Sequence, residues 1–120
     1  MAENYSVNKD TKLLFFDIDG TLITEDGRRY FPESAKKALR QARENGHLVF
    51  INTGRVMCNI TEEIKSAGFD GFVCGCGTYI SYRDQVIFHN ELNRKLCHDI
   101  AMICRKSRMY GLYEHTDGVY

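Results

Sequence analysis

Two aspartates separated by one residue, Asp17 and Asp19, are the clearest candidates for chemistry in the sequence. They follow a short apolar run, and alternation along an extended chain sends both carboxylates to the same side. Gly20 comes next and lets the chain turn sharply beside a ligand. Two close carboxylates repel unless a cation or a shared proton relieves them. The pair therefore predicts a site for a hard divalent cation, and Mg²⁺ suits a site that also holds phosphate.

The same pair could carry out covalent chemistry, because a carboxylate can attack phosphorus and form an aspartyl-phosphate. The second carboxylate can then protonate the leaving oxygen and later activate water. The alternative is a plain strand followed by an Asp-Gly turn, which explains a bare Asp-x-Asp-Gly about as well. Thr21 lengthens the match to Asp-x-Asp-Gly-Thr, which makes a chance occurrence much rarer.

Thr53, followed by Gly54 and Arg55, ends a second apolar run. A hydroxyl and backbone N–H groups at a strand end, leading into a helix N-terminus, make a natural phosphate site. Arg55 has two equal readings, a contact to substrate or cap and an exposed position at the start of a helix. Both polar segments are expected at the carboxyl ends of parallel strands, where open α/β sheets bind ligands.

These two segments resemble the haloacid dehalogenase (HAD) superfamily. The run Phe16-Asp17-Ile18-Asp19-Gly20-Thr21-Leu22 resembles its motif I, and Ile51-Asn52-Thr53-Gly54-Arg55 resembles motif II of the Cof-type, subclass IIB hydrolases. The resemblance implies that Asp17 is the nucleophile and Asp19 the general acid/base. It also implies that Mg²⁺ is held by the Asp17 carboxylate and the Asp19 backbone carbonyl. Phosphate or substrate contacts are then expected from Gly20, Thr21, Thr53, Gly54 and Arg55.

The function implied by this resemblance is Mg²⁺-dependent hydrolysis of a phosphate monoester through an aspartyl-phosphate on Asp17. The substrate class is a small phosphorylated metabolite such as a sugar phosphate, by family analogy alone. Two alternatives stay open. One is a phosphotransferase like phosphomannomutase, which shares this core and cap type, and the other is a catalytically inactive binding or assembly fragment.

The resemblance covers about residues 11–120 and lacks two expected features. The family's motif III lysine and motif IV acidic group normally follow the cap, and no such acidic motif occurs here. Cys76 also stands where Asn is common in Cof-type proteins. The chain is therefore expected to be the N-terminal portion of a longer protein, with low or no activity alone, because phosphoryl transfer depends on positioning and charge neutralisation.

The pattern of apolar residues predicts an α/β fold, a Rossmann-like HAD core of parallel strands with the beginning of an inserted α+β type IIB cap. Residues 1–78 are assigned to the core domain and 79–120 to the cap, and residues 1–11 are read as a loosely held lead-in. Strands are expected at 12–16, 47–51, 71–74 and 110–114, a hairpin at 78–88, and helices at 33–44, 56–67 and 91–107. The first strand is expected to be buried on both faces.

Composition narrows the possible partners. Sixteen basic and sixteen acidic residues leave no net charge, so no global field favours nucleic acid or an acidic membrane. No apolar run approaches a membrane span, and the N-terminus lacks a signal-peptide core, so a cytoplasmic protein is expected. An exposed edge of the first strand would favour self-association.

The five cysteines, odd in number and irregular in spacing, are expected to be reduced thiols. A zinc site built from Cys74, Cys76, Cys97, His98 and Cys104 is a minor alternative, because no Cys-x-x-Cys pair exists. His89, His98 and His115 fall in the predicted cap, where one of them could contact substrate.

Overall fold

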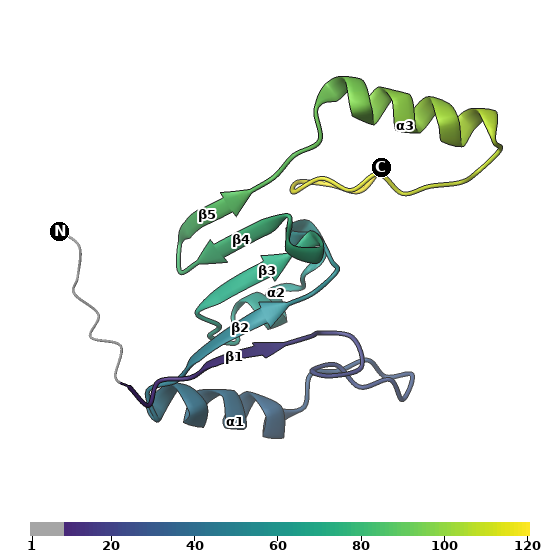
Figure 1. Cartoon of the computed structure of the whole chain (residues 1–120). Helices are drawn as coiled ribbons and strands as arrows, with labels where there is room; N and C mark the ends of the chain where they lie inside the picture. Colours follow the sequence, from purple (N-terminus) through teal and green to yellow (C-terminus); the bar gives the residue numbers. More distant parts are fainter. Residues whose placement is uncertain (1–8) are drawn as a thin grey trace.

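The computed structural model describes residues 9–120, and Figure 1 shows the arrangement of its helices and strands. The predicted lead-in lies largely outside this range. The elements in chain order are β1 (Leu13–Phe16), α1 (Glu33–Glu44), β2 (Leu48–Asn52), the 3₁₀ turn η1 (Met57–Asn59), α2 (Glu62–Lys65), β3 (Gly71–Cys74), the 3₁₀ turn η2 (Gly75–Gly77), β4 (Tyr79–Tyr82), β5 (Gln85–His89) and α3 (Arg94–Lys106).

The five strands form one sheet in the order β1-β2-β3-β4-β5. The first three strands run parallel, with Phe16 of β1 opposite Ile51 of β2. The β4–β5 hairpin continues the sheet in antiparallel fashion. The parallel part confirms the predicted α/β fold class, and it brings the carboxyl ends of β1 and β2 side by side.

One face of the sheet is covered by α1 and α2, and the hydrophobic core lies between them and the strands. Lys36 of α1 and Glu63 of α2 form an ion pair at 2.6 Å, which places the two helices next to each other. Pro32 and Glu33 begin α1, and Gly46, at φ +86°, follows its C-cap, as the sequence predicts. The buried core comprises Ile18, Leu22, Phe31, Leu39, Val49, Ile51, Ile60, Ile64 and Cys74.

The opposite face of the sheet is open at β1, so the prediction of a strand buried on both faces is wrong for the described residues. Leu14 and Phe16 pack against the core, whereas Leu13 and Phe15 are 56% and 52% exposed. The ring of Phe15 stacks on Phe50 with a centroid distance of 5.1 Å. An apolar run alone does not say whether a second layer covers the strand.

The predicted helix at 56–67 is replaced by η1 and the single-turn α2. Ile60 and Thr61 between them are extended, with ψ values of 126° and 151°. The extended backbone lets Ile60 join Ile64 in the core, where they are 2% and 0% exposed. Because β-branched residues lose side-chain freedom in a helix, this pair is a natural place for the helix to break.

The last part of the chain lies beyond β5, away from α1 (Figure 1). Helix α3 begins after Asn93, whose Oδ1 accepts a hydrogen bond from the Leu96 amide at 2.9 Å, and none of its residues is buried. The strand predicted at 110–114 is reduced to one bridge between Glu114 and Val119 in a tight hairpin.

Because β4 pairs with β3, the proposed domain boundary at residue 78 falls within one sheet and stays a prediction. Within residues 9–120, no helix has both the length and the apolar character needed to cross a membrane.

Candidate active site at the carboxyl ends of β1 and β2

The turn after β1 is organised around Ile18, which separates the two aspartates. Its side chain is fully buried, and its carbonyl oxygen accepts hydrogen bonds from the amides of Leu22 and Ile23 at 3.0 and 2.9 Å. Asp17 and Asp19, on either side of it, are both exposed. The core therefore anchors the central residue and leaves the two acidic residues facing solvent at the end of the strand.

Gly20 is required by the geometry of this turn. Its φ is +72°, and a Cβ at this position would lie 2.8 Å from Oε1 of Glu25. Glu25 was not among the sequence candidates, because Glu25-Asp26-Gly27 reads only as a turn signal. Asp19, Gly20, Glu25 and Arg29 line a hollow of about 360 Å³. Thr21 lies in the same exposed turn, and its amide contacts the Ile18 carbonyl at 3.4 Å.

Asp19 is held by two arginines. Arg55 donates from Nε to Oδ2 at 2.8 Å and from Nη2 to Oδ1 at 2.6 Å, and Arg29 donates from Nη2 to Oδ1 at 2.8 Å. The hydrogen bond from Arg55 is the main reason why the pKa of Asp19 lies below its usual value, while partial burial opposes this shift. Arg29 thus pairs with Asp19 although its own side chain is 65% exposed.

Arg55 links the two polar segments. Its side chain is only 22% exposed, and Nη1 donates to the Asn59 carbonyl at 3.1 Å. Its pKa is raised, first by the hydrogen bond to Asp19 and also by the charge of Asp17. Of the two readings of Arg55, the exposed helix-start residue does not match this geometry, because the guanidinium bridges strand ends that are distant in sequence.

Thr53 follows β2 at the same edge of the sheet. It is 5% exposed, and its amide donates to the Val73 carbonyl of β3 at 2.9 Å. Its hydroxyl oxygen accepts the Arg55 amide at 3.2 Å. Gly54 is exposed beside it, and a Cβ there would lie 3.6 Å from Sγ of Cys76. The hydroxyl is thus fixed in the loop, next to an exposed backbone.

The residues at the carboxyl ends of β1 and β2 supply some of the oxygen ligands that a hard cation needs. Asp17 offers an exposed carboxylate, one oxygen of which accepts the Ile18 amide at 2.7 Å. The Asp19 carboxylate is paired with arginine. No group of three or more His, Cys, Asp or Glu side chains that could hold a metal occurs within residues 9–120. Since Mg²⁺ commonly binds through one or two carboxylates together with water and substrate phosphate, such a partial ligand set is compatible with it.

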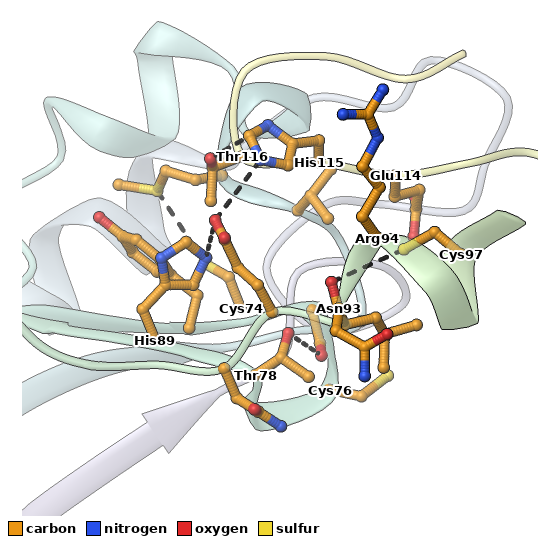
Figure 2. A pocket seen from close by; sticks show the side chains of 18 residues that line it. Cys74, Cys76, Thr78, His89, Asn93, Arg94, Cys97, Glu114, His115 and Thr116 are labelled. Carbon is orange, nitrogen blue, oxygen red and sulfur yellow. Dashed lines mark hydrogen bonds and ion pairs between the residues drawn. The ribbon is translucent and has the colours of Figure 1, made fainter.

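A larger pocket of about 900 Å³ lies on the other side of Gly54 (Figure 2). The segment after β5 and the C-terminal hairpin form its far walls. His89 and His115 both line it, whereas His98 lies outside it on α3, paired with Asp99. Cys74, Cys76 and Cys97 also line the pocket, and all five cysteines are free thiols.

Parallel strands with an Asp-x-Asp turn after the first and a Thr-Gly turn after the second form a Rossmann-like α/β fold with two polar turns at one edge of the sheet. The chain belongs to the haloacid dehalogenase-like hydrolase family, whose profile matches residues 14–120. This match confirms the resemblance inferred from the sequence.

Individual relatives are phosphatases by name. The chain is 36% identical over 83 residues to the "Putative phosphatase YkrA" of Bacillus subtilis (strain 168), covering 69% of this chain and 32% of that protein. It is 30% identical over 92 residues to 5-amino-6-(5-phospho-D-ribitylamino)uracil phosphatase YcsE of the same organism, covering 74% and 34%. The chain thus spans about a third of the length of these curated relatives.

Solved structures agree with the fold. The sugar phosphatase BT4131 of HAD subclass IIB superposes with a TM-score of 0.73 at 28% identity, over 91% of this chain and 43% of that one. A hypothetical protein from Geobacillus kaustophilus HTA426 superposes with a TM-score of 0.78 at 28% identity, over 91% and 42%. The Rossmann-like HAD fold is therefore confirmed for most of the chain.

Proposed function

We propose that this chain carries the nucleophile side of a Mg²⁺-dependent phosphate-monoester hydrolase that acts on a small phosphorylated metabolite. The observation that supports this most is that Asp17, Asp19 and Thr53 follow two paired parallel strands at one edge of the sheet, where Arg55 bonds to both Asp19 and Thr53. The names of the relatives point to the same reaction class.

In the proposed reaction, an Asp17 oxygen attacks phosphorus and the bond from phosphorus to the leaving oxygen breaks. To donate a proton to that leaving oxygen, Asp19 must first take up a proton and leave its ion pairs with Arg55 and Arg29, because these arginines favour its ionised form. A water molecule then attacks the aspartyl-phosphate, Asp19 takes the water proton, and the phosphorus–Asp17 bond breaks to release phosphate. Thr53 holds a phosphoryl oxygen through its hydroxyl. A bound Mg²⁺, held by the Asp17 carboxylate and the Asp19 carbonyl, would screen the negative charge that gathers at this edge.

The activity of this chain alone is expected to be low. Among the described residues, Arg29 and Arg55 pair with Asp19, and no ion pair of Asp17 with a lysine is found. One missing charge-stabilising donor can cost about 3–4 kcal/mol of transition-state stabilisation. Weak turnover is therefore the expected result, with binding of phosphate as the more sensitive measurement.

The test is hydrolysis of p-nitrophenyl phosphate with and without Mg²⁺ by the chain and by Asp17→Asn. Asp26→Asn, which removes an exposed acid in a nearby turn, is the matched control. We expect Mg²⁺-dependent turnover that disappears in Asp17→Asn and persists in Asp26→Asn. Equal rates in all three proteins would contradict the assignment of Asp17, and transfer of phosphate to a hexose acceptor instead of water would favour the phosphotransferase alternative.

The open edge of β1 supports a second proposal, self-association of the chain. Among residues 9–120, β1 is an end strand of the sheet, and its Leu13 and Phe15 side chains are more than half exposed. Unpaired backbone groups beside apolar side chains favour pairing with another strand. Light scattering should show a concentration-dependent dimer that Phe15→Lys weakens, and a monomer at all concentrations would contradict this proposal.

A further inference from the structure

His115 connects the C-terminal hairpin, residues 113–120, to two other segments of the chain. Its Nε2 lies 3.5 Å from Oε1 of Glu91, in the chain after β5, and its carbonyl oxygen accepts a weak hydrogen bond from Sγ of Cys58 in η1 at 3.7 Å. The same Glu91 oxygen lies 3.5 Å from Nε2 of His89, at the end of β5 (Figure 2). Because the hairpin forms one wall of the 900 Å³ pocket, the contacts of His115 hold that wall in place.

Both ring nitrogens of His115 face carboxylates. Nδ1 pairs with Oδ1 of Asp117 within the hairpin, and Nε2 faces Glu91. An imidazolium ring has two N–H donors, whereas a neutral imidazole has one donor and one lone pair. Only a protonated His115 can therefore donate to both acids. A neutral ring must turn a lone pair toward one carboxylate, and that contact then becomes repulsive.

The contact with Glu91 is the one that a neutral ring should give up. Asp117 is two residues from His115 in the same hairpin, and its oxygen lies closer to the ring than the Glu91 oxygen does. The contact with Glu91 also has to hold two segments together that are distant in sequence, which costs more conformational entropy than a local contact. A neutral His115 should thus keep one uncharged hydrogen bond to Asp117, and Glu91 should stay with His89.

The charges around His115 favour its protonated form. The titratable and charged groups near it are Glu114, Asp117 and Tyr120 of the hairpin, His89, Glu91 and Arg94 at and after the end of β5, and Cys58 of η1. The hydrogen bond to Asp117 is the main reason why the pKa of His115 is raised, and the charge of Glu91 adds to it. Protonation is therefore complete below about pH 6.5 and is lost as pH rises through the folded-state pKa of His115.

We propose that His115 is a proton-dependent link in which the protonated ring joins Asp117 to Glu91 and holds the hairpin against the chain after β5, whereas the neutral ring releases Glu91 and frees this wall of the pocket. The side chains of His115 and Glu91 are 51% and 58% exposed, so solvent screening limits the effect. An exposed ion pair changes such an equilibrium by up to about fivefold. The link concerns the conformation of the chain and does not depend on the proposed reaction.

The experiment compares the orientation of the hairpin with that of the sheet in the whole chain, using ¹³Cα–¹Hα residual dipolar couplings. They are measured at about pH 5.5 and about pH 8.5, on either side of the range in which histidine titrates. The variants are His115→Gln and Glu91→Gln. His98→Gln is the matched control, because His98 is an exposed histidine of α3 that faces Asp99 outside the pocket. Unchanged couplings in β2 and β3 show that each variant keeps its fold.

At the lower pH, we expect the hairpin and the sheet of the wild type to share one orientation. At the higher pH the couplings of the hairpin should shrink relative to those of the sheet, with a midpoint at the titration of the His115 ring. His115→Gln and Glu91→Gln should show the smaller couplings at both pH values, and His98→Gln should behave as the wild type. Wild-type couplings that do not change with pH, or a pH response that persists in His115→Gln, overturn the proposal. Loss of the response in His98→Gln would assign it to α3 and overturn the proposal too.

Discussion

The contact between Arg55 and Asp19 should contribute measurably to folding, because it joins two turns that are distant in sequence. The pair is bidentate, at 2.8 and 2.6 Å, and this geometry is the strongest that a guanidinium and a carboxylate can form. Two unit charges about 4 Å apart interact by about 1 kcal/mol in water and by about 4 kcal/mol near a protein surface. The Asp19 side chain is 46% exposed, so solvent screening keeps the coupling near the lower value, about 1 kcal/mol.

A double-mutant cycle with Arg55→Gln, Asp19→Asn and the combined variant measures this coupling from urea unfolding. Repeating the cycle in 1 M NaCl should reduce the coupling, because the Debye length falls to about 3 Å. Arg28 and Asp26 provide the control, an ion pair at 2.8 Å between more exposed side chains of one turn, whose coupling should be much smaller. Equal coupling energies for the two pairs would refute the conclusion that Arg55 stabilises the fold by joining the turns after β1 and β2.

Three further outcomes follow from the burial and pairing of single side chains. Ile18→Ala should lower the free energy of unfolding in urea by about 2–4 kcal/mol, since Ile18 is fully buried. Leu13→Ala at the exposed edge should lower it by less than about 1 kcal/mol. Similar losses of stability in the two variants would contradict the assigned core. Burial raises the pKa of Cys74 to about 11, so Cys74 should react with iodoacetamide at pH 8 far more slowly than the exposed cysteines, as peptide mapping can show. The hydrogen bond to Asp117 raises the pKa of His115. The stabilisation from this pair should therefore be complete below about pH 6.5 and lost as pH rises through the folded-state pKa of His115. An NMR titration in which Asp117→Asn leaves the pKa of His115 unchanged would contradict this pairing.

The parts of the site that depend on local sequence could be predicted. An apolar run followed by Asp-x-Asp-Gly indicates a strand end, and a second run before Thr53 indicates another. Parallel pairing then brings the two ends to one edge, as the structure shows. The positive φ of Gly20 also follows from the local turn. These predictions succeed because strand alternation and turn chemistry are properties of a few neighbouring residues.

The parts that depend on tertiary packing could not be predicted. No local pattern shows that Ile60 must turn into the core and break a helix, or that β1 has one open face. The pairing of Arg29 and Arg55 with one carboxylate also requires the fold, because Arg29 lies at φ +49° in a turn with no other signal. The contacts of Glu91 with His89 and His115 likewise require the fold, because the two histidines come from segments that are distant in sequence.

The two regions beside Thr53 and Gly54 differ in charge, and this difference gives the proposed site its direction. On the side of β1, Arg29 and Arg55 lie against Asp19, so cations already offset an acid where phosphate would bind. On the side of the large pocket, the acids Glu91 and Glu114 lie with one arginine, Arg94, and Glu91 pairs with two histidines. A phosphate monoester is itself charged at one end and neutral at the other. In the proposed site, an ester bound with its phosphoryl group toward β1 would place that anion beside the two arginines, which are permanent cations, whereas the cations facing the large pocket are one arginine and two histidines that already pair with Glu91.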